Sequence, residues 1–278
     1  MGLTIRSQVR LNDGQSMPLF GFGTFRLTEA PETRDAVLAA LEIGYRLIDT
    51  AAVYANEAEV GEGVKLGPVA REELFITTKV WNNDQGYDET LVACHNSLRV
   101  LGMDYVDLYL IHWPVTDKWQ GSWRAMEELR AQGLCRSIGV SNFSIAHLEE
   151  LRAMSNIIPA VNQVEFHPFA YQRDLLQYCQ QQQILLEAYS PLTRGGKLDH
   201  TALVALAEKY HKTPAQILLR WPLQHGIAII PKSSHPDRIR ENADIFDFEL
   251  SAGDMAMLDD LNEDYYGSSH EWCAQFGL

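Results

Sequence analysis

The chain has 278 residues, of which 46% are hydrophobic, and its formal net charge is −14, from 23 Lys and Arg against 37 Asp and Glu. This length suits either two ordinary domains or one α/β barrel, which commonly takes about 250 residues. The acidic balance argues against nucleic acid as the main partner, because phosphate backbones favour a basic face. No apolar run approaches the roughly 20 residues that span a bilayer, so no membrane contact is expected.

The N-terminal residues and the cysteines predict a cytoplasmic protein. The opening stretch M-G-L-T-I-R contains no apolar signal core, and Arg6 stands where a myristoylation motif needs Ser or Thr. The cysteines Cys94, Cys135, Cys179 and Cys273 are widely spaced and form no C-x-x-C pair. In a large chain without a signal peptide, we expect such cysteines to be reduced thiols.

The pattern along the chain begins with a hairpin and then alternates between short apolar runs and helical periodicity. The hairpin is predicted from residues 9–11 and 16–19, which flank an Asp13-Gly14 turn. Pro222 is expected to kink or end the helix that contains it. Strands are predicted at 19–23, 46–49, 73–79, 106–111, 136–140, 160–164, 184–189 and 227–230. Helices are predicted at 31–43, 57–66, 87–100, 122–132, 145–154, 172–182, 200–225 (as two helices) and 236–243.

Eight strands, each followed by a helix, match the count of a (β/α)8 TIM barrel. We therefore expect one α/β domain over residues 1–278, with an N-terminal β-hairpin and a short C-terminal tail. A doubly wound parallel sheet is the alternative fold. That fold usually carries a G-x-G-x-x-G turn, and both near matches fail, because Arg26 and Leu66 occupy the third glycine position after Gly21 and Gly61.

In a TIM barrel, catalytic groups gather at the carboxyl ends of the strands. Nearly every predicted strand ends in a polar or ionisable group here. These strand-end residues are Gly23, Thr24, Asp49, Lys79, His112, Trp113, Ser141, Asn142, Gln163, Tyr189, Ser190, Pro231 and Lys232.

Lys79 ends an apolar, β-branched run, so its ammonium group should be buried and should need a partner. Asp49, at the end of the preceding strand, is the candidate. Tyr54 follows in the next loop, and a nearby ammonium should draw its pKa down from about 10 toward working pH, which gives a usable proton donor. The alternatives are a solvated lysine and a tyrosine packed under a loop.

His112 ends the strand Y-V-D-L-Y-L-I-H. Beside Tyr54 it could hydrogen-bond a substrate oxygen, whereas alone it could be a satisfied core histidine. Metal binding is the rival role. The chain has no H-E-x-x-H motif and its other histidines lie on different elements, so no metal is predicted.

A basic segment near the end of the chain predicts an anion site. Lys232, Arg238 and Arg240 cluster there, with Ser233 and Pro236 where a helix should begin. Free backbone N–H groups at a helix start favour anions, so the segment could hold a phosphate. A solvated basic helix face is the alternative.

Three further strand-end residues fit the other end of a dinucleotide. Tyr189 offers a ring for stacking, and Asn142 and Gln163 carry amides that could bind another amide. Together with the basic segment, they suit a dinucleotide that has a carboxamide at one end and an extra phosphate at the other.

At this point the sequence resembles the aldo-keto reductase family over nearly its whole length. Within the family it is most similar to the bacterial 2,5-diketo-gluconate reductase branch. The matching stretches are G-F-G-T-F (21–25), Y-R-L-I-D-T-A-A-V-Y-x-N-E (45–57), T-T-K-V-W (77–81), D-L-Y-L-I-H-W-P (107–114), G-V-S-N-F (139–143), N-Q-V-E-F-H-P (162–168) and I-P-K-S (230–233).

The resemblance implies an NADPH-dependent reductase of small aldehydes or ketones, such as keto-sugars, methylglyoxal or aromatic aldehydes, acting as a monomer. Tyr54 would donate the proton, Lys79 would lower its pKa, Asp49 would hold Lys79, and His112 would orient the carbonyl. The implied substrate pocket comprises Phe25, Tyr54, Trp81, His112 and Trp113. The implied cofactor residues are Gly23, Thr24, Asp49, Ser141, Asn142, Gln163, Tyr189, Ser190, Leu192, Lys232, Ser233, Arg238, Glu241 and Asn242.

The same resemblance divides the cofactor among these residues. Ser141, Asn142 and Gln163 would bind the nicotinamide carboxamide, with Tyr189 stacked on the ring. Ser190 and Leu192 would run along the pyrophosphate. The 2′-phosphate would be held by Lys232, Ser233 and Arg238, and the adenine would lie near Glu241 and Asn242.

The sequence departs from the family pattern at a few positions. His235 stands where many members have Thr in the phosphate loop, and Phe25 stands where many have Trp. The segment 115–121 is short, which implies a shallow, open substrate pocket. Two other functions stay open: a nucleotide-binding regulatory or structural protein on the same barrel, since fold alone does not fix function, and a metal-dependent hydrolase.

Overall fold

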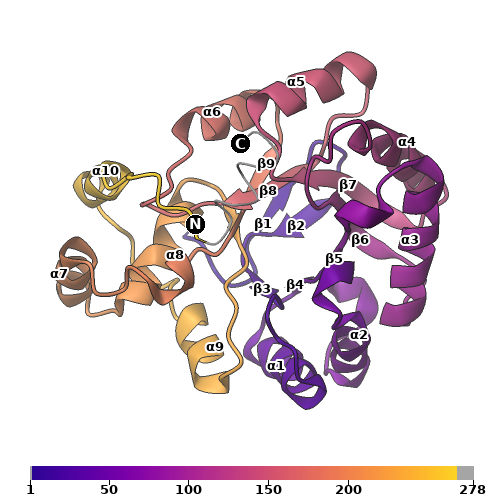
Figure 1. The fold of residues 1–278 in the computed structure, drawn as a ribbon. Coiled ribbons are helices and arrows are strands. Elements are labelled where there is room, and N and C mark those ends of the chain that lie inside the picture. Colours follow the sequence, from indigo (N-terminus) through magenta and orange to yellow (C-terminus); the bar gives the residue numbers. More distant parts are fainter. Residues whose placement is uncertain (1, 268–278) are drawn as a thin grey trace.

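The computed structural model describes residues 2–267. Its main sheet contains eight parallel strands in the order β3 to β10, and helices surround them (Figure 1). A parallel bridge between Phe20 and Ile229 brings the last strand beside the first. The predicted TIM barrel is therefore confirmed. The strands are β3 (Gly21–Gly23), β4 (Leu47–Asp49), β5 (Phe75–Val80), β6 (Val106–Ile111), β7 (Cys135–Ser141), β8 (Val161–Glu165), β9 (Leu185–Tyr189) and β10 (Ala228–Ile229).

Helices follow the strands in the expected alternation. The predicted segment 200–225 is two helices, as expected, because Thr213 caps the second one by accepting a hydrogen bond from the Gln216 backbone N–H. The helices are α1 (Ala30–Ile43), α2 (Glu57–Leu66), α3 (Tyr87–Leu101), α4 (Trp119–Ala131), α5 (Ile145–Met154), α6 (Arg173–Gln181), α7 (Thr201–Tyr210), α8 (Pro214–Gln224), α9 (Pro236–Ala243) and α10 (Ala252–Asp259). Short 3-10 turns are η1 (Ala52–Tyr54), η2 (Arg71–Glu73), η3 (Asn82–Asp84) and η4 (Thr193–Gly195).

The structure differs from the sequence prediction at several boundaries. Helix α10 was not predicted, although Ser251 caps it by accepting from the Asp254 N–H. The first and last barrel strands are shorter than predicted, and α4 begins at Trp119, three residues early. Pro222 lies inside α8, which ends two residues later, so the proline falls in the last turn.

The N-terminal hairpin covers the end of the barrel opposite the strand carboxyl ends. Its strands β1 (Gln8–Arg10) and β2 (Ser16–Pro18) pair antiparallel. Met17 is fully buried, and the Asn12 side chain donates to the Pro159 carbonyl, just before β8 begins. These contacts place the hairpin against the amino ends of the strands.

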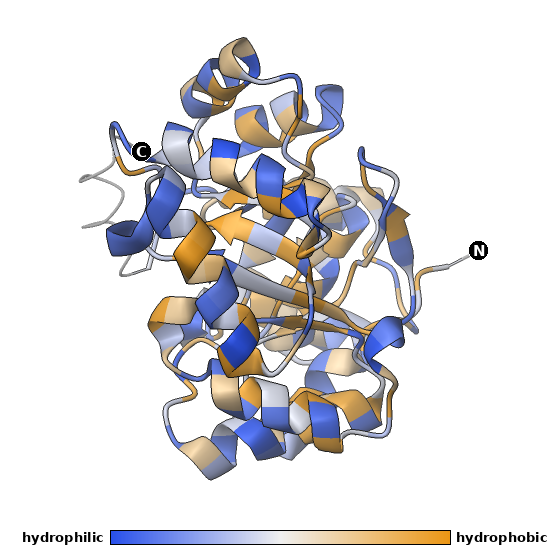
Figure 2. Cartoon of the chain, turned by 90° about the vertical axis from the view of Figure 1, so that its right-hand side faces the viewer, coloured by the Kyte–Doolittle hydropathy of each residue, from blue (hydrophilic) through white to orange (hydrophobic). Residues whose placement is uncertain are grey.

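The barrel strands are buried on both faces, as expected where helices cover a parallel sheet. Every residue of β5 and β6 is buried. Figure 2 shows the apolar colours concentrated on the strands, while the outer helices alternate between apolar and polar residues. Within the described residues, no helix is long and apolar enough to cross a membrane. Cys94, Cys135 and Cys179 are buried free thiols, and Cys273 lies outside the described residues.

Two glycines from the incomplete G-x-G-x-x-G matches, Gly61 and Gly23, allow segments of the chain to pack closely. A Cβ on Gly61 would lie 2.1 Å from the Leu101 carbonyl oxygen, so this glycine lets α2 approach the end of α3. A Cβ on Gly23 would lie 2.8 Å from the Ile230 carbonyl oxygen, where β3 meets the chain after β10. The closed barrel shows that the doubly wound alternative is wrong, so neither glycine belongs to a nucleotide-binding turn of that fold.

Candidate active site

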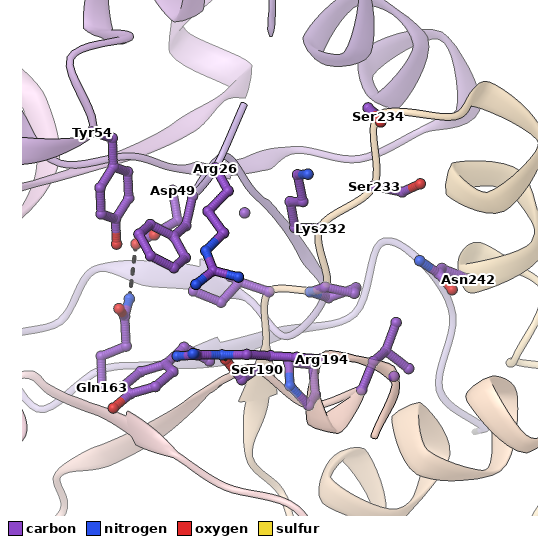
Figure 3. Close-up of a pocket in the computed structure, with 18 of the residues that line it drawn as sticks. Arg26, Asp49, Tyr54, Gln163, Ser190, Arg194, Lys232, Ser233, Ser234 and Asn242 are labelled. Atoms are coloured by element: carbon purple, nitrogen blue, oxygen red, sulfur yellow. Dashed lines mark hydrogen bonds between the residues drawn. The ribbon is translucent and has the colours of Figure 1, made fainter. Parts of the chain in front are cut away.

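A cavity of about 850 Å³ opens at the carboxyl ends of the strands (Figure 3). Tyr54, Asp49 and Gln163 gather at one end of it, and Ser233 and Asn242 lie at the other. The predicted residues in its wall are Gly23, Phe25, Asp49, Tyr54, Trp81, His112, Trp113, Ser141, Asn142, Gln163, Tyr189, Ser190, Leu192, Lys232, Ser233, Arg238, Glu241 and Asn242.

Two predicted residues, Thr24 and Lys79, do not line this cavity. Both are fully buried. The Thr24 hydroxyl donates to the backbone oxygen of Asp49 at 2.9 Å, so it contacts the chain rather than the cavity. Lys79 acts on the cavity only through the residues that it touches.

Lys79 and Asp49 form a buried ion pair beneath the cavity. The Lys79 Nζ lies 2.6 Å from Asp49 Oδ1 and donates to the Thr50 carbonyl at 2.8 Å. Gln163 Nε2 donates to the other carboxylate oxygen, Asp49 Oδ2, at 2.8 Å (dashed line in Figure 3). Burial alone would lower the pKa of Lys79, but the attraction of Asp49 and Tyr54 outweighs it and raises that pKa. Lys79 therefore carries a positive charge at neutral pH.

Tyr54 lies close to both Lys79 and His112. The Lys79 Nζ is 5.1 Å from the centre of the Tyr54 ring, and the His112 ring is 5.7 Å away, edge-on. Burial raises the pKa of Tyr54, and the opposing effect of the Lys79 charge is smaller. The expected net lowering toward working pH is therefore wrong: desolvation disfavours the phenolate more than the ammonium favours it. Tyr54 keeps its proton at neutral pH.

His112 is a neutral imidazole. Burial, together with the Lys79 charge, lowers the pKa of His112 well below its usual value. Its ring is 5.0 Å from Trp81, edge-on, and its backbone oxygen accepts from Asn142 Nδ2 at 3.0 Å. A neutral imidazole carries one N–H donor, and that is the state suited to hydrogen-bonding a carbonyl oxygen.

Three polar residues fix the wall between β7 and β9. The Tyr189 hydroxyl donates to Asn142 Oδ1 at 2.9 Å, and the Ser141 hydroxyl donates to the Gln163 backbone oxygen at 2.8 Å. Asn142 has a φ of 63°, a left-handed conformation that Asn tolerates better than most residues. The Tyr189 ring is thereby held in place from its hydroxyl end.

Cations line the far part of the cavity in an otherwise acidic chain. Lys232 and Arg238 were predicted there, at the start of α9. Burial lowers the pKa of Lys232, the charge of Glu32 opposes this, and the charge of Arg26 adds to the lowering. Glu241 is fixed because its carboxylate accepts from the Thr213 hydroxyl at 2.7 Å.

The lining residues that the sequence interpretation missed include Arg26, Val53, Arg194, Leu198 and Ala215. Arg26 and Arg194 lie along the middle of the cavity in Figure 3, and Arg194 Nε approaches the Ser190 hydroxyl at 3.5 Å. Because the chain has 23 Lys and Arg against 37 Asp and Glu, a basic residue just after a strand end could have been proposed from the sequence as part of an anion site. No sequence pattern marks the small apolar residues. Among residues 2–267, no group of three or more His, Cys, Asp or Glu could hold a metal ion.

Comparisons with known proteins agree with this arrangement. Residues 19–263 match the sequence profile of the Aldo/keto reductase family. A glyoxal reductase of Bacillus subtilis is 54% identical over 95% of this chain and 96% of its own. An aldo-keto reductase from a Medee basin deep-sea metagenome superposes with a TM-score of 0.91, at 45% identity, over 93% of this chain and 96% of its own. A Bombyx mori aldo-keto reductase, solved in complex with NADP, has a TM-score of 0.89 at 39% identity, over 95% of each chain. The chain belongs to the aldo/keto reductase family.

Proposed function

We propose that this aldo-keto reductase uses NADPH to reduce small aldehydes and ketones to alcohols in the cavity above the Lys79–Asp49 pair. One observation carries the proposal. A phenol, Tyr54, and a neutral imidazole, His112, meet beside a buried ion pair at one end of a cavity whose other end is cationic. Two similar proteins support this proposal: the relative named glyoxal reductase and the Bombyx mori aldo-keto reductase solved in complex with NADP.

The residues present fit NADPH by their chemistry. Ser141, Asn142 and Gln163 offer amide and hydroxyl groups for the nicotinamide carboxamide, and the fixed Tyr189 ring can stack on the nicotinamide. Lys232, Ser233 and Arg238 suit the 2′-phosphate, because charge-assisted hydrogen bonds hold phosphate strongly. Glu241 and Asn242 would lie near the adenine. Ser190 and Leu192, with the newly found Arg26 and Arg194, would follow the pyrophosphate.

NADPH, when bound, supplies the hydride. The protein polarises the substrate and delivers a proton. Tyr54 and the neutral His112 each donate a hydrogen bond to the substrate carbonyl oxygen, which makes its carbon easier to reduce. As negative charge develops on that oxygen, Tyr54 gives up its proton. The adjacent Lys79 ammonium, held by Asp49, stabilises the phenolate that remains.

The substrate end of the cavity has an apolar wall. Phe25 and Val53 are 44% and 40% exposed at its mouth, and Trp81 and Trp113 line its side. Segment 115–118 before α4 is short, so the pocket is open to solvent. We infer small carbonyl substrates such as keto-sugars, methylglyoxal and aromatic aldehydes. The similarity to the 2,5-diketo-gluconate branch stays a prediction.

Steady-state NADPH oxidation with a panel of these carbonyls, run in parallel with NADH, tests the proposal. Tyr54→Phe is the matched variant, since it removes only the hydroxyl. We expect kcat to fall about 10²- to 10⁴-fold while the Kd for NADPH changes little. Binding of NADPH without turnover of any carbonyl would instead favour a nucleotide-binding regulatory or structural protein. Unchanged turnover in Tyr54→Phe would remove the proton-donor role.

Three statements about the whole protein stay predictions: a single domain over residues 1–278, a monomer, and a cytoplasmic location. Sedimentation of the purified chain measures the oligomeric state. Limited proteolysis tests the domain organisation, and fractionation of the source cells tests the location.

A further inference from the structure

A buried glutamate lies beside Gln163 and has no role in the mechanism above. Glu187, on β9, is fully buried, and its Oε2 lies 2.7 Å from Gln163 Nε2. The strand register explains the contact, because Gln163 and Glu187 are paired residues of β8 and β9. Burying a carboxyl group costs free energy unless it is hydrogen-bonded, and the Gln163 amide is the hydrogen-bond partner of Glu187. A glutamate kept at this buried position suggests that the contact has a function.

Glu187 completes a bridge of three side chains below the cavity. The Gln163 amide nitrogen carries two hydrogens, and both have an acid as acceptor: Asp49 Oδ2 at 2.8 Å and Glu187 Oε2 at 2.7 Å. The Asp49 carboxylate can only accept, so it fixes which end of the amide is nitrogen, and the second contact to Glu187 fixes the plane of the amide. The Gln163 oxygen is therefore the atom left to accept a hydrogen bond from a ligand in the cavity that Gln163 lines.

We propose that Glu187 is a positioning residue for NADPH, which holds the Gln163 amide with its oxygen available to the nicotinamide carboxamide. The proposal rests on the proposed NADPH site. The carboxamide NH2 needs an acceptor. With only Asp49 as a partner, the Gln163 amide would be held at a single contact and its plane could rotate about that contact. The Gln163 oxygen would then lose its direction toward the carboxamide, and the carboxamide would lose a hydrogen bond.

The surroundings of Glu187 keep it protonated. Asp49 on β4 and Lys79 on β5 are the charged groups that act on it, with Tyr54 nearby on η1. The Lys79 charge is already paired with Asp49 at 2.6 Å, and Glu187 Oε1 has no partner among the described residues. Burial, with the Asp49 charge, raises the pKa of Glu187 to about 8. At pH 7 the neutral carboxyl group accepts from Gln163 through its carbonyl oxygen.

The charge state of Glu187 gives the bridge a pH dependence. Above pH 8, Glu187 becomes an anion beside Asp49 and adds negative charge below a cavity that takes an anionic cofactor. We expect the Kd of the wild-type chain for NADPH to rise as pH passes through about 8. Glu187→Gln keeps an acceptor for Gln163 but cannot ionise, so this step should be absent in that variant.

A double-mutant cycle separates positioning from general structural support. The variants are Glu187→Leu, Glu187→Gln, Gln163→Leu and Glu187→Leu with Gln163→Leu, and the readout is the Kd for NADPH from protein fluorescence at pH 7. Glu187→Leu removes the acceptor, and we expect about ten- to hundredfold weaker NADPH binding. Glu187→Gln should recover the affinity to within about threefold. In the Gln163→Leu background, Glu187→Leu should cause no further loss.

Several outcomes would overturn the role of Glu187. They are an unchanged Kd in Glu187→Leu, an equal loss in Glu187→Gln, and a loss that persists when Gln163 is already Leu. If Glu187→Leu does not fold, the pH comparison decides: the same dependence on pH in wild type and Glu187→Gln would contradict the proposal. Failure of the wild-type chain to bind or oxidise NADPH would contradict the proposed function itself.

Discussion

The Lys79 ammonium lies 5.1 Å from the centre of the Tyr54 ring. At this distance its charge lowers the pKa of Tyr54, but burial raises that pKa by more. Tyr54 therefore holds its proton more firmly than a tyrosine in water. A proton donor of this kind suits reduction, because the oxygen that accepts the proton becomes an alkoxide, a much stronger base than phenolate. The ammonium still matters, since it offsets part of the cost of leaving a charged phenolate in a partly desolvated site.

The raised pKa of Tyr54 predicts the pH dependence of carbonyl reduction. Tyr54 must be protonated to act, and its pKa lies above the ordinary value of 10.0. With NADPH and carbonyl both saturating, kcat should stay level from about pH 6 to 9 and fall only above about pH 10. A kcat profile over this range checks the prediction. A decline centred near pH 7 would mean that another group donates the proton.

Removing Lys79 should lower both the unfolding free energy and kcat, and the two losses can be distinguished with a second substitution. Lys79→Met leaves the buried Asp49 carboxylate without its partner, which costs about 3–5 kcal/mol of unfolding free energy. Lys79→Met combined with Asp49→Asn removes both charges, so most of the stability should return while kcat stays low. Denaturant unfolding and kcat are measured for both variants. Recovery of kcat in the double variant would show that the ammonium does not assist Tyr54.

The 2′-phosphate assignment predicts a difference between the two dinucleotides. Lys232→Ala removes a half-buried cation from the phosphate end, so NADPH should bind about 10- to 100-fold more weakly, while NADH changes little. Lys209→Ala is the control, because Lys209 pairs with Asp254 on α10 and does not line the cavity. Titrations of both nucleotides at two salt concentrations measure the effect. An equal loss for NADH and NADPH would place the 2′-phosphate elsewhere.

The positions of the site residues could be predicted because the barrel gathers strand ends. Once strands ending at Asp49, Gln163 and Tyr189 were recognised, the fold itself required their side chains to meet at one end. The Lys79–Asp49 contact followed from the same reasoning, since a buried lysine needs a carboxylate and the neighbouring strand ends in one.

The pKa direction of Tyr54 could not be predicted from sequence. It depends on how much water the surrounding side chains exclude, and the sequence identifies only the neighbouring ammonium. The Glu187 contact was equally hidden. Glu187 falls inside an apolar strand, L-L-E-A-Y, and nothing local shows that its side chain points to Gln163 rather than to solvent. Register between β8 and β9 decides this, and register is a property of the folded sheet.

The loop that carries Phe25 and Arg26 depends on one buried amide, that of Asn56. Asn56 Nδ2 donates to the Thr24 and Leu27 carbonyls, each at 3.0 Å, and its Oδ1 accepts from the Thr50 hydroxyl at 2.8 Å. The side chain therefore ties the segment after β3 to the segment after β4, on either side of the cavity mouth.

Asn56→Ala would leave two buried polar groups, the Thr50 hydroxyl and the Leu27 carbonyl, without these hydrogen bonds, while the Thr24 carbonyl would keep the Leu27 N–H at 3.1 Å. We expect a loss of about 2 kcal/mol or more in unfolding free energy, because each orphaned group costs about 1–3 kcal/mol. The loop after β3 would also lose its fixed position, so KM for the carbonyl substrate should rise about tenfold, since small displacements of positioning groups are costly. Asn96→Ala is the control: Asn96 is an exposed residue that contacts Arg99, and its loss should cost less than about 0.5 kcal/mol. Denaturant unfolding and steady-state kinetics measure both variants, and equal behaviour of the two would mean that the Asn56 amide does not hold the cavity mouth.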